Sequence, residues 1–295
     1  MMNNLRRILR HLYSGSVQNR LGYSRNSKLL IIHADDVGLS ETENLASFEA
    51  MDKGLVNSGS IMVPCSGFSQ IAEFCRTRRK ADLGVHLTLT SEWSAFKWGP
   101  VISPDKVPSL VDENGMFFES ADLLVQNFSP EDIKTELTGQ IEMALNAGID
   151  LTHIDSHMFT AFSHKDIQNI YVELGEKYRL PVLLSYEFST GYKNKKDSLF
   201  VDHLYYARPK HNVEDLRAYY RQVLRSLKPG LNIILIHPAY KNQEMDDITS
   251  NQPKYGSAWR QADFDFFTGN ECRQMIEEGD IQLVSWREIR EALFR

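Results

Sequence analysis

Three short segments carry side chains that could bind a metal ion or move a proton. Asp35 and Asp36 are adjacent in IIHADDVGLS (31–40), His86 lies in LGVHLTL (83–89), and THIDSH (152–157) contributes His153, Asp155 and His157. Two adjacent carboxylates in an apolar setting are costly unless a cation or a bound proton offsets their repulsion. A divalent metal ion would supply that cation.

The simplest hypothesis assigns one ion to Asp36, His86 and His157. Three nitrogen and oxygen ligands leave coordination positions open for water, which is typical of a catalytic metal site. A divalent ion lowers the pKa of bound water toward ~7, and Asp35 is the natural base to accept the proton of that water. Zinc or magnesium is the first expectation, and manganese, cobalt or nickel would also suit the donor set. The pattern predicts metal-assisted hydrolysis.

Other polar residues are expected around this site. His237 directly follows the apolar run 231–236, and it could protonate a leaving group or hydrogen-bond its loop; we favour the general acid. His153 and Asp155 are expected to support the metal ligands, and Arg260 in SAWRQAD to meet a carboxylate or a sugar. Each residue alone has a structural alternative: helix caps for Asp35 and Asp36, a core histidine for His86, a loop network for His153 and Asp155, and a helix start for Arg260.

The segments that must position these residues alternate strand and helix patterns. Strands are expected over 29–34, 60–63, 83–89, 151–155, 181–184, 231–237 and 282–284. Ser40 with Glu43 forms a capping-box signature for a helix that Gly54 ends, and Ser129 begins a helix that reaches Gly148. About seven such units predict an α/β fold, a closed or nearly closed (β/α) barrel like the TIM barrel, with the active residues at the carboxyl ends of the strands. A doubly wound sheet is the alternative, but no GxGxxG follows the first strand.

Composition narrows the class of protein. The chain has 295 residues and a formal net charge of −6, which excludes a generally basic nucleic-acid binder. Residues 1–28 form a basic N-terminal extension, read either as an organelle transit peptide or as a helix on an acidic body. Residues 29–295 form one domain with a long aromatic loop over 90–128, a candidate lid or binding loop.

Three cysteines without CxxC pairing argue against a disulfide framework. No apolar run approaches the ~20 residues of a membrane span and no secretory signal is present, so a cytoplasmic location is expected.

The motifs together resemble those of the YdjC-like, or ChbG-type, carbohydrate deacetylases. IIHADDVGLS resembles the ADDFG motif of the family with Val37 in place of Phe, and the segments LGVHLTLTSEW, THIDSH, IHPAY and LVSWRE also look like family segments. The resemblance implies a distorted (β/α) barrel that removes N-acetyl groups from amino sugars with a divalent metal ion. It implies Asp35 as the base, Asp36, His86 and His157 as metal ligands, and His237 as a histidine near the acyl group. Trp93 and Trp98 would then stack on sugar faces.

One departure from the family pattern bears on the substrate. Members that resemble chitooligosaccharide deacetylases have further histidines after DSH, whereas Met158, Phe159 and Thr160 follow here.

The expected partner is a small-molecule or oligosaccharide substrate, with no nucleic acid and no membrane, and a homo-oligomer is possible. The alternatives are a metal hydrolase of another amide, ester or phosphoester on the same barrel, and a glycan-binding protein without turnover.

Overall fold

A single curled parallel sheet organises the chain. The computed structural model describes residues 16–188, 199–250, 252 and 254–294. Strand β1 (Lys28–Val37) lies in the middle of the order β4-β3-β2-β1-β8-β7, and β9 also pairs with β1. The other strands are β2 (Ser58–Ile61), β3 (Leu83–Leu87), β4 (Ile154–Ser156), β7 (His203–Tyr206), β8 (Gly230–Ile236) and β9 (Ile281–Leu283). All of β1 after Lys28 is buried, as expected for a parallel strand covered on both faces.

Very short pairings bridge the remaining side of the barrel. Ile154, in β4, forms a single parallel bridge with Val182. The two-residue strands β5 (Leu184–Ser185) and β6 (Phe200–Val201) pair next to it, and β6 is followed closely in the chain by β7. The sheet is therefore a distorted, incomplete (β/α) barrel in one domain, which confirms the predicted fold class.

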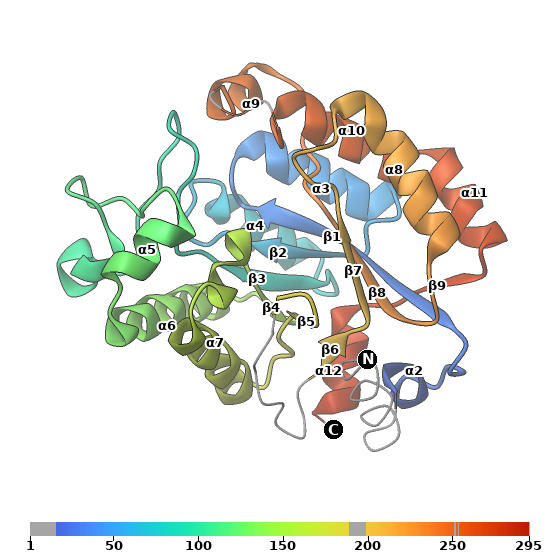
Figure 1. The fold of residues 1–295 in the computed structure, drawn as a ribbon, viewed down its shortest axis with the longest axis horizontal. Helices are drawn as coiled ribbons and strands as arrows, with labels where there is room; N and C mark the ends of the chain where they lie inside the picture. Colours follow the sequence, from blue (N-terminus) through green and yellow to red (C-terminus); the bar gives the residue numbers. More distant parts are fainter. Residues whose placement is uncertain (1–15, 189–198, 251, 253, 295) are drawn as a thin grey trace.

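Helices cover the outside of the sheet (Figure 1). Helices α6 and α7 lie along one flank, and α3, α8, α10 and α11 lie along the other. Their bounds are α2 (Val17–Arg20), α3 (Glu41–Lys53), α4 (Phe68–Thr77), α5 (Ala121–Asn127), α6 (Pro130–Asn146), α7 (Lys165–Tyr178), α8 (Val213–Ser226), α9 (Gln243–Ile248), α10 (Ser257–Thr268), α11 (Asn270–Glu278) and α12 (Trp286–Leu293). Short 3-10 turns are η1 (Pro104–Lys106), η2 (Pro108–Leu110) and η3 (His157–Phe162).

Local sequence signals predicted where several of these helices begin. Ser40 and Ser129 are the N-caps of α3 and α6, and the hydroxyl of Ser40 accepts from the backbone N–H of Glu43 at 3.3 Å. The capping-box expectation is only half right, because the Glu43 carboxylate does not return to the cap and instead accepts a hydrogen bond from Arg260. A long-range ion pair has replaced a local contact.

The segment over residues 90–128 contains regular structure and is fixed to the barrel. It includes η1, η2 and α5, and Phe117 is buried within it. The buried carboxylate of Glu136, on α6, accepts the backbone N–H groups of Val101 and Ile102, both at 3.0 Å. This segment forms a packed wall on one side of the barrel mouth.

The predicted basic extension lies mostly outside the described residues, which include only its residues 16–28. Helix α2 in this part contacts α12 and β8.

Among the described helices, none is long and apolar enough to cross a lipid bilayer. Cys65, Cys75 and Cys272 are free thiols.

Candidate metal and catalytic site

A distortion at the end of β1 gives Asp35 and Asp36 access to the same site. In a regular strand, adjacent side chains point to opposite faces. Here the register with β2 shifts between Ala34 and Val37, and Asp36 adopts a left-handed conformation with φ of 63°. Carboxylate oxygens of both aspartates then lie within 4.8 Å of a nitrogen of His86. Left-handed backbone costs a non-glycine residue roughly 1–2 kcal/mol, so neighbouring contacts must hold it.

Three potential ligand atoms converge on one point at the strand ends. Oδ1 of Asp36 lies 3.5 Å from Nε2 of His86 and 3.2 Å from Nδ1 of His157. Each of the three residues is 3 % exposed. No described residue donates a hydrogen bond to Oδ1 of Asp36, although this oxygen is fully buried. An unsatisfied buried carboxylate oxygen facing two imidazole nitrogens is the donor set that a divalent metal ion requires.

A buried partner orients the second polar atom of each ligand. Oδ2 of Asp36 accepts from Arg260 at 2.9 Å. The remaining pairs are His86 Nδ1 with Asp155 Oδ1 at 2.7 Å and His157 Nε2 with Glu92 Oε2 at 2.9 Å. Partners of this kind set the orientation and tautomer of metal-binding residues.

These charges change the acidity of the ligands. Burial opposes ionisation of Asp36, but the Arg260 guanidinium and the His157 imidazole hold its pKa well below the ordinary value. Burial also opposes protonation of His157, yet the carboxylates of Glu92 and Asp36 raise its pKa to about 10.

Arg260 holds two buried carboxylates together. Besides Asp36, it donates to Glu43 at 2.8 Å, and its Nε donates to the Tyr255 carbonyl at 2.8 Å. Burial raises the pKa of Glu43 to about 8, with the nearby Asp36 adding to the shift and Arg260 opposing it. Arg260 therefore meets carboxylates, one of the two outcomes expected from the sequence. Its predicted contact with substrate stays a prediction.

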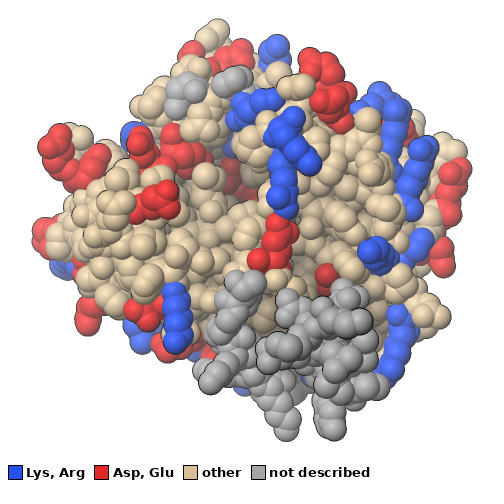
Figure 2. All heavy atoms as spheres, viewed as in Figure 1, with Lys and Arg blue, Asp and Glu red and all other residues tan. Residues whose placement is uncertain are grey.

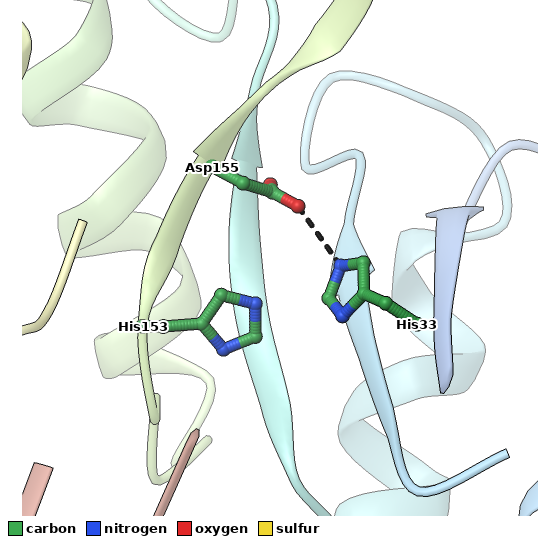
Figure 3. A group of neighbouring side chains, drawn as sticks. All are labelled: His33, His153 and Asp155. Atoms are coloured by element: carbon green, nitrogen blue, oxygen red, sulfur yellow. Dashed lines mark hydrogen bonds and ion pairs between the residues drawn. The ribbon is translucent and has the colours of Figure 1, made fainter. Parts of the chain in front are cut away.

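A second group of potential ligands lies deeper in the barrel and consists of His33, His153 and Asp155. Figure 3 shows Asp155 pointing at His33, which lies 2.9 Å away, while the ring of His153 is joined to neither. Both oxygens of Asp155 are already occupied, one by His33 and one by His86. His33 and Asp155 thus belong to a hydrogen-bond network that His153 does not join, and the third group of potential ligands, Asp35, His86 and Asp155, depends on the same occupied Asp155. The group containing Asp36 therefore fits a metal ion best.

Asp35 and His237 face each other beside the potential ligands. Nε2 of His237 lies 3.9 Å from Oδ2 of Asp35, and the His237 side chain is 20 % exposed. The backbone N–H of His237 donates to Asp263 at 3.0 Å, which fixes the end of β8. Burial lowers the pKa of His237, although Asp36 and Asp35 oppose the shift. The pair is placed to accept and return a proton next to the converging ligand atoms.

The remaining predicted residues are buried. Trp98 is 4 % exposed, donates from its indole to the Thr90 carbonyl at 3.0 Å, and contacts His157 edge to face. Trp93 is 2 % exposed and lies beside the Arg260 guanidinium. In this structure both indoles belong to the wall of the site, and their stacking on a sugar stays a prediction. His153 stacks on Trp286 and does not hydrogen-bond the ligand residues.

Sequence reasoning missed three residues that shape the site: His33, Glu43 and Glu92. His33 and Glu92 lie inside motifs that had been singled out, two residues before Asp35 and six residues after His86. Strand alternation places His33 on the same face as Asp35, which was an available signal. No comparable signal linked Glu43 to an arginine 217 residues away in the chain.

Comparison with known proteins agrees with this geometry. The sequence profile described as YdjC-like protein matches residues 29–278. This chain belongs to the YdjC-like family. Within the family, it is 32 % identical over 268 residues to a carbohydrate deacetylase of Brevibacillus brevis, covering 88 % of this chain and 99 % of that protein. It is 32 % identical over 285 residues to a carbohydrate deacetylase of Thermus thermophilus, covering 93 % and 98 %.

A solved YdjC-like fold also superimposes on this one. The crystal structure of a protein from Enterococcus faecalis matches with a TM-score of 0.74 at 26 % identity, covering 89 % of this chain and 99 % of that chain. The match extends over nearly the whole barrel, so the arrangement of strand ends described above belongs to a fold that has been observed experimentally.

Proposed function

We propose that this YdjC-like protein is a metal-dependent hydrolase that removes N-acetyl groups from amino sugars or oligosaccharides. The convergence of Asp36, His86 and His157, with Oδ1 of Asp36 left unsatisfied, is the observation that carries the proposal. The relatives named carbohydrate deacetylase cover nearly the same length of chain and supply the substrate class.

Asp36, His86 and His157 would hold the ion. A divalent metal ion in that position supplies Lewis-acid chemistry, polarising an amide carbonyl and acidifying water. Asp35 is adjacent to this point and accepts the proton of the attacking water. His237, 3.9 Å from Asp35, takes over the proton that Asp35 has accepted and donates it to the departing amine. Its lowered pKa suits this step, because the protonated imidazole is a stronger acid than free imidazolium.

The charge balance favours amide hydrolysis over phosphoester hydrolysis at this site. Phosphoryl transfer recruits basic side chains to stabilise negative charge on the substrate. Arg260 is the basic side chain in contact with the potential ligands, and both of its charged contacts are carboxylates of the protein. On the face drawn in Figure 2, acidic and basic side chains are interspersed among the described residues, without a continuous basic surface.

Elemental analysis of the purified protein, paired with acetate release, tests the proposal. The panel consists of N-acetylated mono- and oligosaccharides assayed before and after chelation. Stoichiometric metal and chelator-sensitive acetate release are expected. Metal without acetate release would move the substrate to another amide or ester, and a protein without affinity for any divalent metal ion would overturn the metal assignment.

A further inference from the structure

His33 occupies a central position in the site that the proposed chemistry does not yet use. It lies on β1 two residues before Asp35 and is 0 % exposed. Its Nε2 lies 2.9 Å from Asp155 Oδ2 and 3.3 Å from Asp35 Oδ1, and its Nδ1 lies 3.0 Å from the hydroxyl of Ser58. One buried imidazole nitrogen thus faces two carboxylates that belong to different parts of the site.

The acceptors around these rings determine where the protons lie. An ionised carboxylate only accepts, so Nδ1 of His86 must donate to Asp155. The lone pair of His86 is then on Nε2, the atom that faces Asp36. By the same reasoning, Nε2 of His33 carries a proton and donates to Asp155. Asp155 therefore selects the metal-binding tautomer of His86, and His33 holds the other oxygen of Asp155.

These contacts connect the base to a metal ligand through buried groups. The path runs from Asp35 to His33, then to Asp155 and to His86, with the polar contacts 3.3, 2.9 and 2.7 Å long. The hydroxyl of Ser60 lies between the two rings, 3.1 Å from His33 Nε2 and 3.0 Å from His86 Nδ1. The contacts of Asp155 with His33 and His86 are hydrogen bonds, whereas Oδ1 of Asp35 has no hydrogen-bond partner among the described residues and meets His33 by charge alone. Buried hydrogen-bond networks restrict motion more than isolated contacts do.

We propose that His33 is a positioning residue whose Nε2–H group, donated to Asp155 beside the Asp35 carboxylate, fixes the general base relative to the metal ligand His86. This inference rests on the proposed function, because it concerns the geometry of the same site. His33 lies outside the group Asp36, His86 and His157, and acts on it through Asp155 and Asp35. Removing its Nε2–H should loosen His86 and Asp35 together, weakening metal binding and slowing the chemical step.

Two variants separate this role from simple packing. In His33→Gln, the side-chain amide N–H reaches the place of Nε2, whereas in His33→Asn it reaches only the place of Nδ1, near Ser58. His153→Leu is the matched control, since His153 is equally buried, lies 5.0 Å from the His33 ring, and has no polar contact with the network. Zinc affinity is measured for each apo-protein by competition with a chromophoric chelator, and kcat and KM with an N-acetylated oligosaccharide.

His33→Asn should lose up to roughly 10-fold in zinc affinity, the lower end of the effect of removing a direct partner of a metal ligand, because His33 acts on His86 only through Asp155. Its kcat should fall with little change in KM, and His33→Gln should recover most of both losses. His153→Leu should unfold at a lower temperature yet keep the zinc affinity of the wild type. Equal zinc affinity in His33→Asn and the wild type would overturn the inference, as would a loss in His153→Leu as large as that in His33→Asn.

Two controls complete the test. If neither His33 variant folds, two-bond 1H–15N correlations of the zinc-loaded wild type decide. Protons on His33 Nε2 and His86 Nδ1 support the inference, and the absence of a proton from either of these two atoms overturns it. The wild type distinguishes failure of the proposed function from failure of the inference about His33. If the wild type neither binds zinc nor releases acetate, the proposed function is overturned. If the wild type is active and His33→Asn is unaffected, only the role of His33 is overturned.

Discussion

The guanidinium of Arg260 lies 2.9 Å from Oδ2 of Asp36, and Oδ1 of the same carboxylate is left without a hydrogen-bond donor among the described residues. Arg260 thus fixes Oδ2 of Asp36 and leaves Oδ1 free for a metal ion. Asp36 is also the residue with left-handed backbone at the end of β1. The ion pair is therefore well placed to hold a conformation that the strand alone would not favour.

Replacing Arg260 should be costly because its partners stay buried. We expect Arg260→Met to lower the free energy of unfolding by about 3–5 kcal/mol, since Asp36 and Glu43 lose their counter-charge. Arg260→Lys should rescue little, because one ammonium cannot reproduce a guanidinium that spans two carboxylates. Urea denaturation measures the change. The control is Arg78→Met, which breaks the exposed pair with Asp52 and should cost about 1 kcal/mol or less.

Single substitutions should distinguish the role of the base from that of the metal ligands. Asp35→Asn should abolish acetate release while metal stays bound, because Asp35 is not among the three converging ligands. His86→Ala should lose both, because it removes a donor. Mass spectrometry of metal content and an acetate assay on the same preparations provide the measurement. Undiminished activity in Asp35→Asn would remove Asp35 from the role of base.

Gly84 leaves the space that the His153 ring fills. A Cβ at position 84 would lie 2.5–2.7 Å from three atoms of this ring, which also stacks on Trp286. Gly84→Ala should therefore destabilise the fold by about 1–3 kcal/mol through overpacking. In a His153→Ala background the same change should cost less, since the ring is gone. A double-mutant cycle by denaturation checks this, and a coupling free energy near zero would contradict it.

Asp263 should give the fold a pH dependence in the weakly acidic range. Burial raises the pKa of Asp263 to about 6, despite hydrogen bonds from Tyr220 and from the backbone of His237. The native state then holds the proton more tightly than the unfolded state does. The resulting stabilisation is complete below pH 3.8 and is lost as the pH rises through 6.

Comparing Asp263→Asn with the wild type isolates this effect. Between pH 4 and pH 7, the free energy of unfolding of the wild type should fall by about 2 kcal/mol relative to that of the variant. Denaturation of both apo-proteins in the presence of a chelator keeps metal binding out of the comparison. Parallel pH profiles for the two proteins would show that Asp263 does not titrate in this range.

Much of the fold was predictable because its signals are local. The apolar run at 29–34 is part of β1, and Ser40 and Ser129 begin the helices assigned to them. The metal-binding hypothesis followed from one general property: carboxyl ends of parallel strands meet at one face of a barrel, so residues that end different strands come together. This brought Asp36, His86 and His157 to one point.

The unpredicted features depend on contacts between distant positions. The bulge at Asp36 and the two-residue strands β5 and β6 have too few residues to produce a periodic pattern. Glu43 looked like a helix cap, because nothing near it in sequence indicates that Arg260 will arrive from α10. Which side chains form such ion pairs depends on which of them are buried together, and that is determined only when the whole barrel has assembled.

The pairing of β1 also has a consequence for how the chain folds during synthesis. Its first half pairs with Gly230–Ile236 and with Ile281–Leu283, and Asp36 meets its arginine partner 224 residues later in the chain. Apart from its pairing with β2, this buried, apolar strand stays unpaired until those much later segments have been made, which favours slow folding. Asp35 and Asp36 precede the other residues proposed for the chemistry, yet Asp36 can meet its arginine partner only after Arg260 has been made.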